Sequence, residues 1–296
     1  MNNLEGDYHL IGGTASVDTK FLDDTKIEIV GDLPGRAKPE HALFDFDGTL
    51  SLIREGWPNV MIRMMVEILQ ATDTTETTEK LQDIVEDFVM ELTGKQTIYQ
   101  MMRMAEEVTK RGGKPDEPLA YKQEYNNRLM LHIEDRRELL RNSGDVEAML
   151  VPGSIAILES LKSRGVELYL ASGTDQQFVK EEVALLGIDQ FFGDNIHGAL
   201  DDHRMFSKAM VIERILEENQ MDSTSLVGFG DGYVEIQNIR DAGGVAIAVA
   251  SDEAGRSGKP DEWKRNRLVG AGAHVVIPDF RETEQLIQFL FHSQLD

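Results

Sequence analysis

The feature that most constrains the fold is an alternation of short apolar runs with helical patterns, which begins near residue 151 and continues along the rest of the chain. Apolar runs of this kind, bounded by turn residues, are typical of buried strands. Strands separated by helices imply a parallel sheet with helices on both faces. We therefore predict an α/β fold with a Rossmann-like parallel sheet as its core. The expected strands are residues 42–44, 166–171, 195–199, 226–229, 245–249 and 275–277.

The stretch between residues 55 and 149 has a different pattern. Apolar residues recur there at helical spacing, beginning with Met61, Met64 and Met65, and the stretch carries no strand signal. We interpret the methionines as core residues, because their flexible side chains fill irregular gaps. We therefore predict an inserted all-helical domain over 55–149, which interrupts an α/β core formed by 41–54 and 150–296. Its expected helices cover about 61–69, 81–92, 98–105 and 119–140.

Residues 1–40 form an N-terminal extension that is rich in turn signals. Within it, residues 27–30 have the composition of a short strand. This segment either adds an edge to the sheet or stays partly mobile, and the sequence assigns it no function.

Composition limits the classes of partner. The chain has 53 acidic and 30 basic residues and a net charge of −23, so it lacks the basic surface that nucleic acid requires. It contains no cysteine, which excludes disulfides and thiolate chemistry. No apolar stretch is long enough to span a membrane and the N-terminus has no signal-peptide pattern. We expect a cytoplasmic protein that binds neither nucleic acid nor membranes, and the sequence leaves its oligomeric state open.

An acidic pair follows the first apolar run of the core. Asp45 and Asp47 are two residues apart, so at a strand end their side chains point to the same side. Gly48 then allows the chain to turn away. Such a pair can provide one carboxylate to attack a substrate and another to transfer a proton, with both near a bound cation. The alternative is a solvated acidic turn.

Two later strands also end in polar residues. Ser172-Gly173-Thr174 follows the run 166–171, and Gly230-Asp231-Gly232 follows the run 226–229. Ligands of open parallel sheets bind beyond the carboxyl ends of the strands. Taken singly, Ser172 could instead be a helix N-cap and Gly-Asp-Gly an ordinary turn.

Two charged residues complete this set. Lys208 lies at the start of a predicted helix, and Glu235 lies four residues beyond Asp231. Each could be an ordinary surface residue. The order of all these groups, at successive strand ends, favours one shared site.

These motifs resemble those of the haloacid dehalogenase superfamily, in particular its phosphatase branch. The resemblance covers residues 41–54 and 150–280, and it rests on Asp45–Thr49, the strand that ends at Ser172, Lys208, and Gly230–Glu235. It implies that the helical insertion is the cap of this family, as in phosphoglycolate phosphatase and β-phosphoglucomutase relatives.

The resemblance also implies roles for the acidic residues. Asp45 would be the nucleophile that forms an aspartyl-phosphate, and Asp47 would be the general acid and base. Mg²⁺ would be held by the Asp45 carboxylate, the backbone carbonyl of Asp47, and Asp231, which agrees with the preference of this cation for oxygen ligands.

The remaining motif residues would bind the phosphoryl group. Ser172 and the backbone amide of Gly173 would hold its oxygens, and Lys208 would neutralise its charge and that of Asp45. Glu235 departs from the family, which often has aspartate here. Its longer side chain either reaches a water on the metal or holds Lys208.

The sequence therefore predicts a Mg²⁺-dependent phosphatase that acts on a small phosphorylated metabolite, for which a sugar phosphate is one candidate. A phosphomutase on the same fold and a non-catalytic binding protein are the alternatives. Arg54 and Lys95 are candidates for binding a second anionic group, or else ordinary solvated charges. The charged segment 252–267 either approaches the site or forms a solvated loop.

Overall fold

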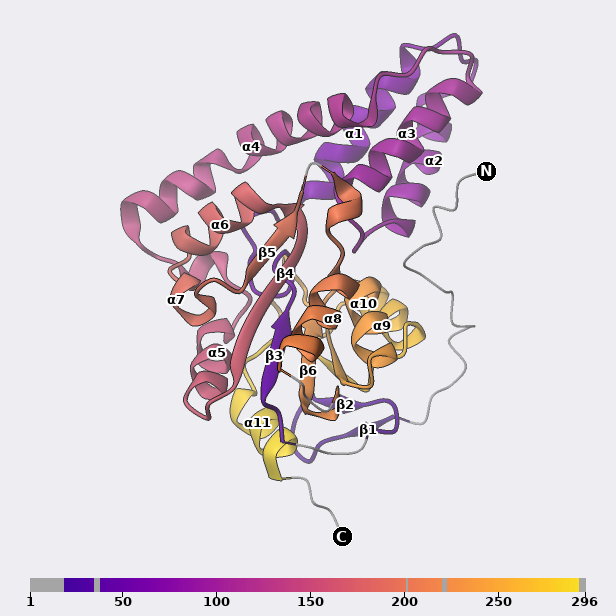
Figure 1. Cartoon of the computed structure of the whole chain (residues 1–296). Helices are drawn as coiled ribbons and strands as arrows, with labels where there is room; N and C mark the ends of the chain where they lie inside the picture. Colours follow the sequence, from indigo (N-terminus) through magenta and orange to yellow (C-terminus); the bar gives the residue numbers. More distant parts are fainter. Residues whose placement is uncertain (1–18, 35–37, 201, 220–222, 293–296) are drawn as a thin grey trace.

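The computed structural model describes residues 19–34, 38–200, 202–219 and 223–292. These residues form an α/β structure around a central sheet (Figure 1). The sheet has eight strands in the order β1-β2-β8-β7-β6-β3-β4-β5. The strands are β1 (Lys20–Phe21), β2 (Glu28–Ile29), β3 (His41–Phe44), β4 (Glu167–Asp175), β5 (Ile196–Ala199), β6 (Leu226–Gly230), β7 (Val245–Val249) and β8 (Val275–Ile277).

The strand β3 lies near the middle of this sheet. It pairs in parallel with β4 on one side and with β6 on the other, and Phe44 lies opposite both Leu170 and Phe229. The pairs β4–β5, β6–β7 and β7–β8 are also parallel. The predicted parallel core is thus confirmed. It brings the carboxyl ends of β3, β4 and β6 to the same edge of the sheet.

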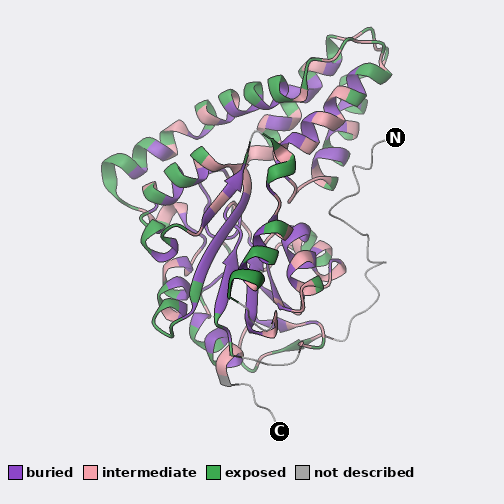
Figure 2. Cartoon of the chain, viewed as in Figure 1, coloured by how far each residue is buried: buried purple, intermediate pink, exposed green. Residues whose placement is uncertain are grey.

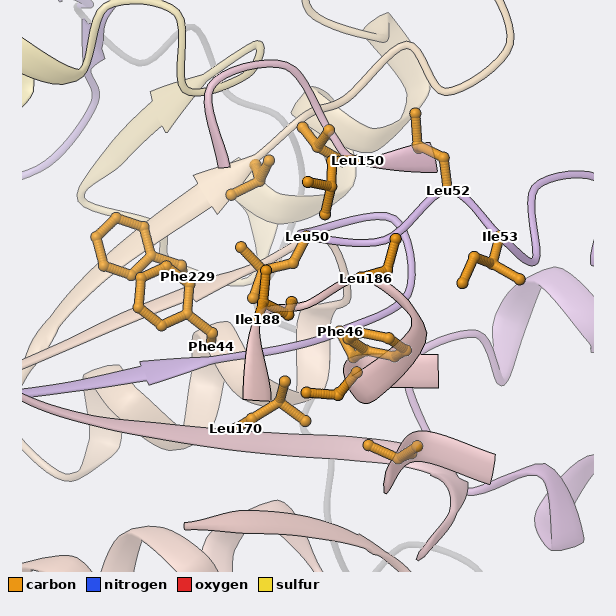
Figure 3. Packing of buried hydrophobic residues seen from close by; sticks show 14 of the residues in the cluster. Phe44, Phe46, Leu50, Leu52, Ile53, Leu150, Leu170, Leu186, Ile188 and Phe229 are labelled. Atoms are coloured by element: carbon orange, nitrogen blue, oxygen red, sulfur yellow. The ribbon is translucent and has the colours of Figure 1, made fainter. Parts of the chain in front are cut away.

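The two faces of the sheet carry separate apolar layers. Along β3, Phe44 belongs to one layer and Leu43 to the other, as the two-residue period of a strand requires. Phe44 stacks on Phe229 with ring centroids 4.5 Å apart and also contacts Phe280 (Figure 3).

Helices cover both layers. The helices α5 (Ser154–Lys162) and α11 (Thr283–His292) contribute to the layer of Phe44. The layer of Leu43 is covered by α8 (Lys208–Asn219), α9 (Tyr233–Asp241) and α10 (Glu262–Gly270). Two further helices, α6 (Gln176–Leu185) and α7 (Asp189–Phe192), follow β4.

The insertion between β3 and α5 is helical, as predicted. It consists of α1 (Trp57–Gln70), α2 (Thr78–Glu91), α3 (Thr97–Lys110) and the long α4 (Pro118–Ser143), which runs along one end of the molecule (Figure 1). Met61, Met64 and Met65 are at most 1% exposed, so they are core residues, as the sequence indicates. Figure 2 shows that the outward side of α4 is exposed.

Two connecting segments join the insertion to the sheet, and they lie side by side. Leu52 donates its N–H to the carbonyl of Met149 (2.9 Å), and Val151 donates to that of Leu50 (2.9 Å). Ser51 and Leu150 form an antiparallel bridge between these bonds. The insertion therefore leaves and rejoins the core through one short two-stranded link.

The N-terminal extension is described only in part. The predicted strand at 27–30 is β2, which pairs antiparallel with β8 and with β1. The described part of the extension thus adds an edge to the sheet, which is one of the two arrangements that the sequence left open. Residues 1–18 and 35–37 lie outside the described residues.

The end of one predicted strand is wrong in detail. The strand β4 continues to Asp175, so Ser172-Gly173-Thr174 lies within the strand, and Asp175 precedes α6 as its N-cap. Ser172 is therefore not a helix N-cap. The segment 252–267 approaches the site through Glu253 and Lys264, which is one of the two arrangements that the sequence left open. It also contains most of α10, whose strongly charged sequence conceals a helix. None of the helices in the described ranges combines the length and apolarity that crossing a membrane requires.

Candidate active site

Asp45 and Lys208 form a buried ion pair at the end of β3. The side chain of Lys208 is 5% exposed, and its Nζ lies 2.8 Å from Asp45 Oδ1 and 2.8 Å from Glu235 Oε2. Burial lowers the pKa of Lys208, but the two carboxylates raise it above its ordinary value. Burial raises the pKa of Asp45 well above its ordinary value, and Lys208 opposes that shift. Lys208 therefore favours the charged form of Asp45.

Asp47 has different surroundings. Its Oδ2 accepts hydrogen bonds from Thr174 Oγ1 (2.8 Å) and Ser172 Oγ (3.3 Å). Its Oδ1 is buried and has no hydrogen-bond partner among the described residues, although Arg54 Nε lies 3.8 Å away. Buried polar atoms are almost always paired. Because Asp47 lines the pocket described below, this oxygen can accept a hydrogen bond from a ligand.

The turn after Asp47 brings it close to Asp231. Gly48 has a φ of 73°, and a Cβ at this position would lie 2.1 Å from Asp231 Oδ2. Only glycine combines this backbone conformation with such a close approach. Phe46, between the two aspartates, is fully buried in the apolar layer, so Asp45 and Asp47 share the opposite side, as predicted.

The acidic residues fit a hard divalent cation. Asp45, Asp231 and Glu235 each bring a carboxylate oxygen within 4.8 Å of the others. An all-oxygen set of this kind suits Mg²⁺. Both oxygens of Glu235 are engaged, one by Lys208 and one by the Gly232 N–H at 2.5 Å. This leaves Asp45, Asp231 and the backbone carbonyl of Asp47 as the better candidates for ligands.

A pocket lies over these groups, between the insertion and the sheet. Its empty volume is about 660 Å³, a figure that includes space open to solvent. The predicted residues that line it are Asp45, Asp47, Arg54, Lys95, Ser172, Gly173, Lys208 and Asp231. The structure thus brings together the residues that the sequence singled out for catalysis, metal binding and substrate binding.

Arg54 is not an ordinary solvated charge. It is 5% exposed, and its Nε and Nη2 donate to Glu182 of α6 at 2.8–3.2 Å. Burial lowers the pKa of Arg54, but Glu182 and Asp47 raise it above its ordinary value. Lys95 is half-buried at the pocket, with its ammonium 5.7 Å from the ring centroid of Tyr99.

The segment between α2 and α3 packs directly on the site. A Cβ on Gly173 would lie 3.0 Å from the carbonyl oxygen of Lys95, and one on Gly94 would lie 3.3 Å from the Cα of Gly232. Gln96 Nε2 donates to the carbonyls of Phe206 (2.7 Å) and His203 (3.1 Å). The insertion is thus docked against the ends of β4 and β6.

Several pocket residues were not predicted. Thr174 follows two predicted residues, so its position in the motif is a signal for it. Tyr125 of α4, and Glu253 after β7, also line the pocket. Lys264 of α10 contacts Asp231 at 2.8 Å. Glu253 and Lys264 lie in the charged segment 252–267, for which an approach to the site was one of the two alternatives. The sequence carries no local signal for Tyr125, which reaches the site from a helix.

Comparisons with known proteins agree with this geometry. The family model described as haloacid dehalogenase-like hydrolase matches residues 39–243. The chain therefore belongs to this family of hydrolases. No curated protein sequence matches it.

Solved structures share the fold at low sequence identity. A predicted phosphoglycolate phosphatase from Haemophilus somnus 129PT has a TM-score of 0.56 and 15% identity, covering 86% of this chain and 100% of its own. A β-phosphoglucomutase from Clostridium difficile has a TM-score of 0.55 and 15% identity, and the match covers 86% of this chain and 97% of that one. A predicted phosphatase from Clostridium acetobutylicum has a TM-score of 0.53 and 18% identity, and the match covers 85% of this chain and 99% of that one.

Proposed function

We propose that the protein is a Mg²⁺-dependent phosphatase that hydrolyses a small phosphorylated metabolite through an aspartyl-phosphate on Asp45. In this proposal residues 55–149 act as a cap over a catalytic core of 41–54 and 150–296. The observation that carries it is the unlike surroundings of two neighbouring carboxylates. Asp45 is paired with Lys208, whereas Asp47 is held by two hydroxyls and keeps one oxygen that has no hydrogen bond from any described residue. Such a difference suits a nucleophile beside a proton carrier.

The proposed reaction has two steps. An oxygen of Asp45 attacks phosphorus, and Asp47 gives a proton to the leaving alcohol. Asp47 then takes a proton from the water that releases phosphate. Lys208 balances the charge of Asp45, while Ser172 and the N–H of Gly173 hold phosphoryl oxygens. Bound Mg²⁺ would supply further compensation of the phosphoryl charge.

The pocket supports a small anionic substrate, such as a sugar phosphate. Arg54 and Lys95 both line it, and we propose that they orient a second polar or anionic group. Glu182 neutralises the charge of Arg54, so this arginine would contribute directed hydrogen bonds more than net attraction.

A phosphomutase is the second candidate, because the docked segment around Lys95 and Gln96 shields the site. Exclusion of water favours transfer of the phosphoryl group to another hydroxyl. Product analysis on a hexose phosphate separates the two: a phosphatase releases inorganic phosphate, whereas a mutase mainly returns an isomeric hexose phosphate.

The test is phosphate release from a panel of phosphorylated sugars, nucleotides and small acids, with and without Mg²⁺. We expect Asp45→Asn to lower the rate on the best substrate by on the order of 10³-fold or more, because it removes the nucleophile. Asp83→Asn, an exposed carboxylate on α2, is the control. Equal rates for Asp45→Asn and the unmodified chain would refute the assignment of Asp45 as the nucleophile. If no compound in the panel releases phosphate, a non-catalytic binding protein is favoured.

A further inference from the structure

The ammonium group of Lys264 lies beside Asp231, a proposed metal ligand. Its Nζ donates to Asp231 Oδ2 (2.8 Å), Glu253 Oε1 (2.6 Å) and Ser251 Oγ (3.0 Å). The side chain is only 12% exposed. Burial lowers the pKa of Lys264, but the two carboxylates raise it above its ordinary value, so the group is charged.

These three contacts use the whole donor capacity of the lysine. An ammonium group has three N–H donors and no acceptor, and each donor has a partner within the protein. Lys264 is therefore placed to fix its neighbours, and it has no donor left for a substrate.

Two of these contacts lead to different parts of the metal site. One goes directly to Asp231, a proposed ligand. The other goes to Ser251, whose Oγ in turn donates to the carbonyl of Gly48 (2.6 Å). Gly48 follows Asp47, whose carbonyl is a second proposed ligand. Lys264 thus connects the strand end at Asp231 with the turn after β3.

Glu253 makes this arrangement dependent on the lysine. It lines the same pocket, and burial raises the pKa of both Glu253 and Asp231, a shift that Lys264 opposes. Without the ammonium group, the buried carboxylates of Asp231 and Glu253 would lose the positive charge that lies between them. They would repel each other and separate, which moves an oxygen of Asp231.

We propose that Lys264 is a positioning residue that orients Asp231 and the Gly48 turn for binding of the divalent cation. This inference rests on the proposed metal-dependent function. Residues that orient metal ligands typically change metal affinity by about 10–100-fold when they are replaced. A purely electrostatic effect of the lysine would change metal affinity in the opposite direction, because removal of a nearby positive charge strengthens binding of a cation. Weaker metal binding by a Lys264 variant therefore indicates a positioning role, and tighter binding indicates a purely electrostatic one.

The experiment is a titration of the full-length protein with Mn²⁺, followed by the electron paramagnetic resonance signal of the free ion. We expect Lys264→Met to weaken binding by about 10–100-fold. Lys259→Met, an exposed lysine between β7 and α10, is the matched control and should bind as the unmodified chain does. Equal or tighter binding by Lys264→Met overturns the proposal.

A second variant keeps all charges in place. Ser251→Ala removes the hydroxyl that connects Lys264 to the carbonyl of Gly48, and we expect it to weaken Mn²⁺ binding several-fold while circular dichroism and metal-free unfolding temperature stay unchanged. If Lys264→Met fails to fold, Ser251→Ala decides the question, and unchanged affinity then refutes the positioning role. If the unmodified chain itself shows no saturable Mn²⁺ binding, both the metal-dependent function and this inference fail. If it binds and the variants match it, only the inference fails.

Discussion

Both carboxylate oxygens of Glu235 are used within the protein. One accepts from Lys208, and the other accepts from the N–H of Gly232 at the start of α9. Of the two roles that the sequence left open for Glu235, the structure shows the contact with Lys208. Glu235 therefore links the ammonium group of Lys208, which pairs with Asp45, to the backbone next to Asp231.

This arrangement predicts that Glu235→Asp lowers activity, although aspartate is the residue that the family often has here. The shorter side chain cannot reach both Lys208 and Gly232, so we expect kcat to fall by about 10–100-fold. The measurement is steady-state kinetics on the best substrate, with Glu213→Asp on α8 as control. An unchanged kcat would show that the length of this side chain has no role.

Three acidic residues of the site could be predicted from the sequence because topology brings them together. Asp45, Asp47 and Asp231 follow strands that are neighbours in the sheet, and parallel strands end at a common edge. Lys264 could not be predicted in this way. Its contact depends on how α10 packs after β7, which no local pattern encodes. Lys208 was recognised because its motif has a fixed place in the family.

At the scale of elements, α10 also contacts the insertion. Arg267, three residues after Lys264, donates to the carbonyls of Glu91 (2.7 Å) and Thr93 (3.4 Å) at the end of α2. Its guanidinium lies 4.5 Å from the ring centroid of Tyr233 and 5.0 Å from that of Trp263. Regular apolar stripes predict a helix directly, whereas the many charges of α10 conceal its helical pattern.

These contacts predict that Arg267→Ala weakens the docking of the segment that leads to Lys95. We expect KM to rise about three- to tenfold, with a smaller change in kcat, because lost contacts of this strength are worth about 1 kcal/mol. The control is Arg63→Ala, whose side chain is 84% exposed on α1. A normal KM for Arg267→Ala would mean that docking does not depend on this contact.

At the scale of the whole molecule, the net charge of −23 opposes the approach of the anionic substrate that we propose. Screening weakens this repulsion, since the Debye length falls from about 30 Å at 10 mM salt to about 8 Å at 150 mM. We expect kcat/KM to rise about two- to fivefold over this range at constant, saturating free Mg²⁺. A steep fall with added KCl would instead indicate attraction of the substrate by a basic surface.

The two-stranded link between residues 50–52 and 149–151 has a consequence for how such proteins diversify. Because both ends of the insertion meet across paired backbone bonds, the four helices occupy what is geometrically a hairpin loop. Exchanging them for another set of helices would leave the pairing of β3 with β4 and β6 untouched. Under the proposed function, substrate choice could therefore change by replacement of the four helices, while the proposed chemistry at Asp45 would be inherited intact.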